Sequence, residues 1–340
     1  MGRRGVGSRG ETKISSLSPL SPIPCLSHLS PLTFHLLSKT MAYQTWDDRY
    51  KRLVPDKIRN QGCAPQIIQH NEVTENAIVL IHGLTDSSYF MKPIGQEFYR
   101  NGFNVVIPLL PGHGLKDPEK KMASVNLAEW QNEVNFAVDC AKKLGKRVSI
   151  GGLSTGGALS VWKASINPDD ITGGLFLFSA ALDLGPGWGD AAERLLRFNP
   201  LVNLVDAVQD RVQVGLIGNN PYRYARMDTN GAARLSELIK EIEDRYRNKP
   251  KYSDINQPVF IAHSESDKAA DIAELDVLFK NHPRKDKIQF FRIPKKDNVS
   301  HASMILVDNL LSSTGAILER KNPLFGEMMR QAVEFSKKHL

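Results

Sequence analysis

A short glycine-rich run between a strand-like and a helix-like segment constrains the fold of this chain most. The run GLSTG, residues 152–156, closely follows the strand-like residues 147–150 and opens a stretch of helical pattern at 155–165. A turn this tight needs small residues on both sides of its serine, and glycine stands at both positions. The turn would lift the hydroxyl of Ser154 to the end of a strand, which makes Ser154 a candidate nucleophile.

Short apolar runs alternate with amphipathic, helix-like segments along most of the chain. Strands are expected at 77–81, 104–108, 147–150, 174–178, 258–262 and 287–293, and helices at 90–100, 127–144, 155–165 and 323–339. Continuous apolar strands separated by amphipathic helices are typical of an α/β fold. We therefore expect a mostly parallel central sheet with helices on both faces.

One stretch breaks this alternation. Residues 183–257 contain no clear strand, while 191–198 and 232–247 have helical patterns. Ligands of open α/β sheets bind at the carboxyl ends of the strands, so helices inserted after one strand fit a cap over those ends. We predict one domain over 41–340 that carries a helical cap insertion at about 183–257.

The first forty residues differ from the rest. Residues 1–40 repeat Ser, Leu and Pro without a strand or helix period, which predicts a disordered, low-complexity extension. Their Arg- and Ser-containing, acid-poor composition also fits an organellar transit peptide, and Met41 is an alternative start. Without such a peptide we expect a cytoplasmic protein.

The charge and the cysteines exclude several classes of function. The formal net charge is +7, of which residues 1–40 carry +4, so the other 300 residues carry only +3. Basic and acidic residues are interspersed there, which argues against a nucleic-acid partner. No apolar run is long enough to span a membrane. The spacing of Cys25, Cys63 and Cys140 indicates neither a disulfide framework nor a metal site.

A serine hydroxyl needs a base, and the base needs an orienting acid. In a sheet of this kind the acid and then the histidine follow the serine along the chain. His301 lies just after the expected strand 287–293, whereas His282 lies in a polar connector and His339 at the end of a helix. His301 is therefore the predicted base.

The predicted acid is Asp267, which closely follows the expected strand 258–262. Glu265 and Asp271 lie nearby as alternatives. Asp183 is the strongest rival because it also follows a strand, 174–178. The order of residues alone leaves this choice open.

The mechanism also requires two backbone N–H donors that stabilise the negative oxygen of a tetrahedral intermediate. One is the N–H of Thr155, directly after the serine, and the other is expected from Leu84 in the loop after strand 77–81. His82 precedes the serine, so we expect it to be a structural hydrogen-bonding residue. His113 is given no catalytic role.

Several runs of the chain together resemble the successive motifs of the α/β-hydrolase superfamily. The runs are LIHGLTDSS, PLLPGHG, GGLSTGGALS, PVFIAHSESDKAAD and VSHASM, and the resemblance extends from residue 77 to the C-terminus. Their spacing is most similar to bacterial carboxylesterases, monoacylglycerol lipases and lysophospholipase-like hydrolases, which are grouped with the serine aminopeptidase (S33-type) domain. One departure concerns the acid's loop, where Ser264 stands in place of the glycine that many members have.

The resemblance implies an α/β-hydrolase fold with a helical cap and a nucleophile elbow. It implies Ser154, Asp267 and His301 as the catalytic triad, with Leu84 and Thr155 as the donors of the oxyanion hole. The expected function is a serine carboxylic ester hydrolase that works through an acyl-enzyme, since this triad needs no cofactor or metal.

The sequence leaves several functional questions open. Thioesterases, acyltransferases and aminopeptidases use the same triad, and a non-catalytic ligand-binding relative would keep the pocket. The expected partner is a small-molecule acyl ester, with transient contact with lipid surfaces. The sequence does not set the acyl-chain length, the leaving group or the oligomeric state.

Overall fold

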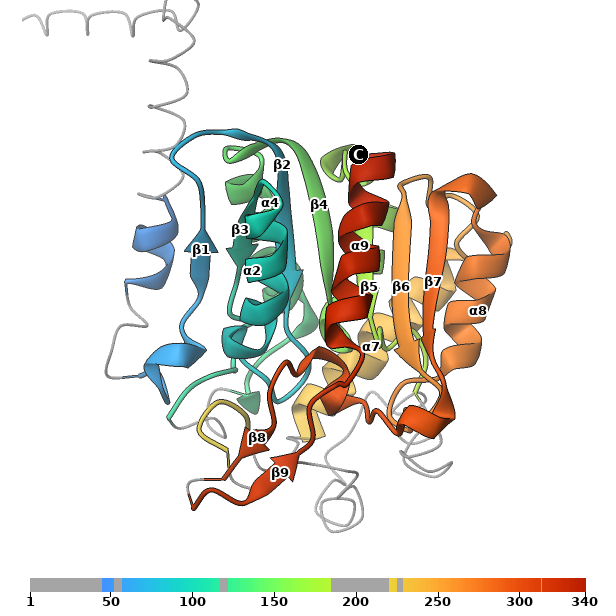
Figure 1. Cartoon of the computed structure of the whole chain (residues 1–340). Coiled ribbons are helices and arrows are strands. Elements are labelled where there is room, and N and C mark those ends of the chain that lie inside the picture. The colour runs from blue at the N-terminus through green and yellow to red at the C-terminus, as the bar shows by residue number, and fades with distance from the viewer. Residues whose placement is uncertain (1–44, 52–56, 117–121, 185–219, 225–228, 313) are drawn as a thin grey trace, which may run out of the picture.

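A seven-stranded sheet in the order β1-β3-β2-β4-β5-β6-β7 forms the centre of the molecule (Figure 1). The computed structural model describes residues 45–340 except 52–56, 117–121, 185–219, 225–228 and 313. The strands are β1 (Gln66–Ile68), β2 (Thr74–Ile81), β3 (Phe103–Ile107), β4 (Gly145–Leu153), β5 (Leu175–Phe178), β6 (Val259–Ser264) and β7 (Ile288–Ile293). Only β1 pairs antiparallel with its neighbour in this sheet. The expected mostly parallel sheet is therefore confirmed.

Helices cover both faces of the sheet, as the apolar strands predict. They are α2 (Lys92–Arg100), α4 (Leu127–Ala141), α5 (Thr155–Ile166), α8 (Ile272–Asn281) and α9 (Phe325–His339). In β2, Ile78 and Leu80 belong to the core cluster that holds residues of α2 and α9. Val79 and Ile81 belong to the cluster of α4, α5 and α8. Successive side chains of a strand point to opposite faces, so a strand buried on both faces reads as a continuous apolar run.

The structure contains elements that the sequence patterns did not predict. Strand β1 is short and half-buried, and α8 lies where no helix was expected, its start capped by Asp271, which accepts the N–H of Ala273 at 2.8 Å. After His301 the chain forms a hairpin of β8 (Leu310–Leu311) and β9 (Ile317–Glu319). Short 3₁₀ helices span Gln61–Cys63, Ser88–Met91, Pro168–Asp170, Lys285–Lys287, Lys295–Asp297 and Ala302–Ile305.

Part of the expected cap is described. The helix predicted at 232–247 is present as α7 (Thr229–Arg245), whereas the one predicted at 191–198 lies outside the described residues. Glu241 of α7 accepts hydrogen bonds from Trp162 Nε1 of α5 and Gln131 Nε2 of α4, both at 2.8 Å. These contacts place α7 against α4 and α5. Residues 1–40 also lie outside the described part.

In the part of the chain that the structure describes, no helix has the length and apolar character needed to cross a bilayer. Cys63 and Cys140 are both buried, free thiols. Cys140 packs in the core beside α4 residues, as expected for a small apolar side chain.

Candidate active site

Ser154 lies at the sharp turn between β4 and α5. Its backbone has φ 55° and ψ −117°, a conformation that residues with a side chain rarely adopt. The turn is held because the N–H of Ser154 donates to the carbonyl of Phe178 at 3.1 Å, and the Ser154 carbonyl accepts the N–H of Ala158 at 3.0 Å. The side chain is mostly buried, with 8% of the residue exposed. Such local strain is typical of a nucleophile held at the end of a sheet.

The glycines around Ser154 are required by close packing. A Cβ atom on Gly156 or on Gly152 would overlap the carbonyl oxygen of Ile81, at the end of β2. Any side chain at either position would therefore push the first turn of α5 away from the sheet. This explains in physical terms why the run flanks its serine with glycine.

The loop after β2 touches the serine. A Cβ on Gly83 would lie 3.4 Å from Ser154 Cβ, so the backbone of this loop passes directly beside the turn that holds Ser154. Among the described residues, the N–H of Leu84 and the N–H of Thr155 donate no hydrogen bond. Thr155 is also the first residue of α5, where N–H groups have no partner within the helix. Both groups are thus available to a negatively charged oxygen.

His82 fixes the peptide that carries the Leu84 N–H. Its Nε2 accepts the N–H of Leu110 at 3.1 Å, which places the ring proton on Nδ1, and Nδ1 donates to the Gly83 carbonyl at 2.9 Å. The Gly83 carbonyl and the Leu84 N–H belong to one planar peptide, so holding one orients the other. Burial lowers the pKa of His82 to about 4, although the Gly83 carbonyl opposes this, and the ring stays neutral near pH 7.

His301 and Asp267 are brought together. His301 Nδ1 lies 2.7 Å from Asp267 Oδ2, although the two residues follow different strands. Asp267 Oδ1 accepts the N–H groups of Ala269 and Ala270 at 2.8 and 3.1 Å, which fixes the orientation of the carboxylate. Within the described chain, neither Nε2 of His301 nor Oγ of Ser154 makes a hydrogen bond. Nε2 is therefore available for proton transfer.

The interaction between His301 and Asp267 lowers the pKa of Asp267 and raises the pKa of His301. Burial alone would raise the pKa of Asp267, but the charge and hydrogen bond of His301 outweigh it and lower that pKa to about 2. Burial alone would lower the pKa of His301, but the attraction of Asp267 and its hydrogen bond raise it above the usual value. Asp267 is thus ionised at all ordinary pH values, and His301 holds its proton more tightly than a free histidine.

The alternative acids and bases have other partners. Asp183 accepts the N–H of Leu184 at 2.6 Å, Glu265 accepts the N–H of Lys295 at 3.1 Å, and Asp271 caps α8. His282 is buried and bonds to backbone carbonyls, and His339 lies near the ring of Phe335 at the end of α9. His113 is buried beside His82, with its pKa lowered to about 3 by burial and by that neighbour. Of the candidate acids, it is Asp267 that accepts the hydrogen bond of His301 Nδ1.

Three residues near the site were not predicted from the sequence. His263, on β6, places Nε2 3.8 Å from Asp267 Oδ2. Asp86 lies in the loop after β2 and forms a buried ion pair with Arg223. An acidic residue just after a strand end is a signal that would have flagged Asp86. No such signal exists for Arg223, because its partner lies 137 residues away.

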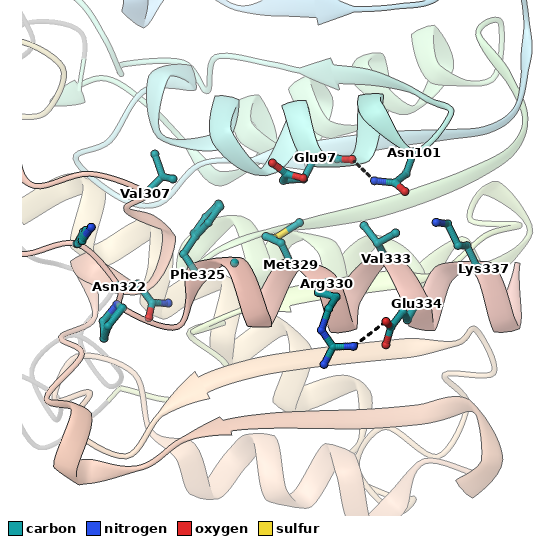
Figure 2. Close-up of a pocket in the computed structure, with 13 residues that line it drawn as sticks. Glu97, Asn101, Val307, Asn322, Phe325, Met329, Arg330, Val333, Glu334 and Lys337 are labelled. Atoms are coloured by element: carbon teal, nitrogen blue, oxygen red, sulfur yellow. Dashed lines mark hydrogen bonds and ion pairs between the residues drawn. The ribbon is translucent and has the colours of Figure 1, made fainter.

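A groove of about 580 Å³ lies elsewhere, between α2 and α9 (Figure 2). Phe325, Met329 and Val333 of α9 line its apolar part, and Arg330, which pairs with Glu334 at 2.6 Å, lies at its rim. None of the expected catalytic residues lines this groove. It belongs to the side of the sheet covered by α2 and α9 and is separate from the candidate active site.

The mostly parallel sheet, with a serine at a strained strand–helix turn and a histidine–aspartate pair after β6 and β7, defines an α/β-hydrolase. The family model described as serine aminopeptidase, S33, matches residues 72–292, well over half of the chain. The chain belongs to this hydrolase family.

Comparison with known proteins agrees with this class. The chain is 23% identical over 223 residues to a thermostable monoacylglycerol lipase of Bacillus sp. (strain H-257), which covers 64% of this chain and 80% of that protein. Its fold is similar to the monoacylglycerol lipase of Paleococcus ferrophilus, with a TM-score of 0.60 at 18% identity, covering 81% of this chain and 99% of that chain. A structure described with LipS and LipT, two metagenome-derived lipolytic enzymes, is similar with a TM-score of 0.61 at 19% identity, covering 82% and 99%.

Proposed function

We propose that this chain is a serine hydrolase that cleaves carboxylic esters through an acyl-enzyme, with Ser154 as nucleophile, His301 as base and Asp267 as acid. The observation that carries the proposal is the 2.7 Å hydrogen bond from His301 to Asp267, which leaves Nε2 available. This arrangement can take the proton of a serine hydroxyl as the hydroxyl attacks an ester carbonyl.

The proposed reaction has two halves. In the first, Ser154 Oγ bonds to the ester carbonyl carbon while His301 Nε2 accepts the proton, and the N–H groups of Leu84 and Thr155 stabilise the oxyanion. His301 then donates this proton to the leaving alcohol as the ester bond breaks. In the second half, water attacks the acyl carbonyl while His301 Nε2 takes its proton. His301 returns this proton to Ser154 Oγ as the acyl–serine bond breaks and the acid leaves. The reaction uses no cofactor.

The substrate is proposed to be a small acyl ester, and the lipase names of the relatives support an ester with a fatty acyl group. Apolar side chains exposed on the hairpin β8–β9 support transient contact with a lipid surface. Leu311 and Ile317 are 47% and 55% exposed, and Val307 before the hairpin is 47% exposed. The hairpin lies beyond the carboxyl ends of the parallel strands (Figure 1). Ser154 directly follows the carboxyl end of β4, one of these strands.

The acids on α7 already have partners, which argues against the amine-binding role that an aminopeptidase would need from them. Glu241 accepts from Trp162 and Gln131, and Asp244 pairs with Lys240 and Arg247 on the surface. Because these acids already have partners, they support an ester over a peptide substrate. Thioesterase and acyltransferase activity use the same groups and are outcomes of the test below.

The test combines a covalent label with a substrate panel. A fluorophosphonate probe should label Ser154, identified by peptide mass analysis, and p-nitrophenyl esters of graded chain length should be hydrolysed with a preference for one length. Parallel assays with an acyl thioester and an acyl-acceptor alcohol separate the thioesterase and acyltransferase alternatives. A folded protein that is not labelled at Ser154 would favour a ligand-binding relative, and together with no turnover of any ester it would contradict the proposal.

A further inference from the structure

A buried ion pair joins the loop after β2 to a segment of the expected cap. Arg223 Nε donates to Asp86 Oδ1, and the two side chains are only 5% and 3% exposed. Asp86 lies in the loop that carries Leu84, between β2 and the short helix that begins at Ser88, whereas Arg223 belongs to residues 220–224. A pair this well buried stabilises only if both charges stay together, because either one alone would be left without solvation.

Further contacts hold segment 220–224 on the same loop. The N–H of Tyr224 donates to the Thr85 carbonyl at 2.9 Å, and Ser87 Oγ donates to the Tyr222 carbonyl at 2.8 Å. Arg223 also lies over the ring of Phe90, with Cζ 4.2 Å from the ring centre. Segment 220–224 thus contacts the loop through backbone, hydroxyl and guanidinium groups, and Arg223 supplies the charged contact.

The Asp86 carboxylate lies beside the nucleophile. The position of a Cβ on Gly83 is 2.9 Å from Asp86 Oδ2 and 3.4 Å from Ser154 Cβ, so the carboxylate and the serine flank the same glycine. A tetrahedral intermediate on Ser154 would develop its negative charge close to this carboxylate. In a buried site, an unpaired carboxylate in the loop beside the serine would oppose an oxyanion there.

We propose that Arg223 is a positioning residue of the active site, whose guanidinium neutralises the Asp86 carboxylate beside Ser154 and holds the loop that presents the Leu84 N–H. Turnover then depends on segment 220–224 being seated on the loop. The inference rests on the proposed function, because the charge that Arg223 protects is the oxyanion of ester cleavage.

The same pair acts on His301. The charged and titratable groups that face His301 or its partner are Asp267, Asp86, Arg223 and His263. Asp86 raises the pKa of His301 and Arg223 lowers it, after the larger effects of burial and of Asp267. Loss of Arg223 alone should therefore move the acid limb of the pH–rate profile to higher pH, and loss of Asp86 alone should move it to lower pH.

The experiment compares R223M, D86N and the double variant R223M/D86N, with R330M on α9 as a matched surface-arginine control. Turnover of a short soluble p-nitrophenyl ester is measured per active site, titrated with a fluorophosphonate, across pH. R223M should lower kcat by about 10- to 100-fold, and the double variant should recover most of that loss because no unpaired carboxylate remains. R330M should match the wild type.

Several results would overturn the inference. They are a wild-type kcat in R223M, a double variant as slow per active site as R223M, and acid limbs that do not move in opposite directions in R223M and D86N. If R223M does not fold, the acid limb of D86N and the kcat of R223K, expected near wild type because Lys keeps the charge, decide the question. If Ser154→Ala is inactive and R223M is as active as the wild type, the inference about Arg223 is refuted and the proposed function is not. If Ser154→Ala is active, the proposed function is refuted.

Discussion

His301 can act as a base only in its neutral form, so the groups around it set the pH range of activity. Asp267 accepts its Nδ1 proton at 2.7 Å and raises its pKa above the usual value. Below that pKa the ring is protonated and cannot take the proton of Ser154. We therefore expect kcat/KM to rise with pH along a limb centred above the ordinary histidine pKa of about 6.5.

Replacing Asp267 by Asn tests the choice of acid. The amide cannot stabilise the imidazolium and favours the wrong tautomer of His301, so kcat should fall by about 10³- to 10⁴-fold. The acid limb should also shift to lower pH, since the partner that raises the pKa is gone. Steady-state kinetics between pH 5 and 9 measure both effects. Asp183→Asn is the control, and its inactivation beside an active Asp267→Asn would reverse the assignment.

Replacing His82 by Leu tests how the oxyanion peptide is held. Without the Nδ1–H bond to the Gly83 carbonyl, the peptide that ends in the Leu84 N–H would lose its fixed orientation. We expect kcat to fall by up to about 100-fold, the scale of one misplaced oxyanion donor, with little change in KM. Leu at His70, which bonds to the Tyr99 carbonyl away from the site, should leave kcat unchanged. A large rise in KM at constant kcat would instead indicate a binding role for His82.

At the scale of elements, the lengths and patterns of the strands determined how much of the fold and of the candidate site could be predicted from the sequence. Ser154, Asp267 and His301 each follow a strand that can be recognised in the sequence. Parallel strands bring their carboxyl ends to one edge of the sheet. The bond between His301 and Asp267 agrees with that reasoning, while their roles stay predictions. Strands β1 and β8 are only three and two residues long, too short for any period. The Asp86–Arg223 pair depends on how segment 220–224 folds back, which no local pattern encodes.

The hairpin β8–β9 gives a prediction at this scale. The double substitution Leu311→Ser and Ile317→Ser removes two exposed aliphatic side chains, each worth up to about 1.5–3 kcal/mol when fully buried in an apolar phase. Activity on an emulsified long-chain ester should fall about 10-fold at low enzyme concentration, which corresponds to only a part of that free energy. Hydrolysis of a soluble short ester should not change. Phe279→Ser, on the exposed surface of α8, is the matched control. Equal loss on both substrates would show that the hairpin supports the fold and not a lipid contact.

At the scale of the whole molecule, the described residues from 45 onward anchor the N-terminal part of the chain on the sheet. Trp46 and Tyr50 pack in the core that contains α4, and the Tyr50 hydroxyl donates to Glu133 of α4. Glu133 is buried and also pairs with Arg49 at 2.7 Å. Glu133 thus joins the start of the described chain to α4 within the core, so its loss should affect unfolding of the whole domain.

Glu133→Ala should therefore lower the free energy of unfolding by about 1–3 kcal/mol, because the buried Tyr50 hydroxyl loses its acceptor. Urea unfolding followed by circular dichroism measures the change. Glu327→Ala, which breaks an exposed pair with Arg330, should leave the free energy of unfolding nearly unchanged, because solvent screens the pair. Equal effects of the two substitutions would contradict the structural role given to Glu133.

Ser154→Ala decides whether Ser154 is the nucleophile of an ester hydrolase. Turnover of the best p-nitrophenyl ester should fall by about 10⁴-fold or more, with no fluorophosphonate labelling and an unchanged urea midpoint. An alanine variant that folds and hydrolyses the ester at the wild-type rate would contradict the account.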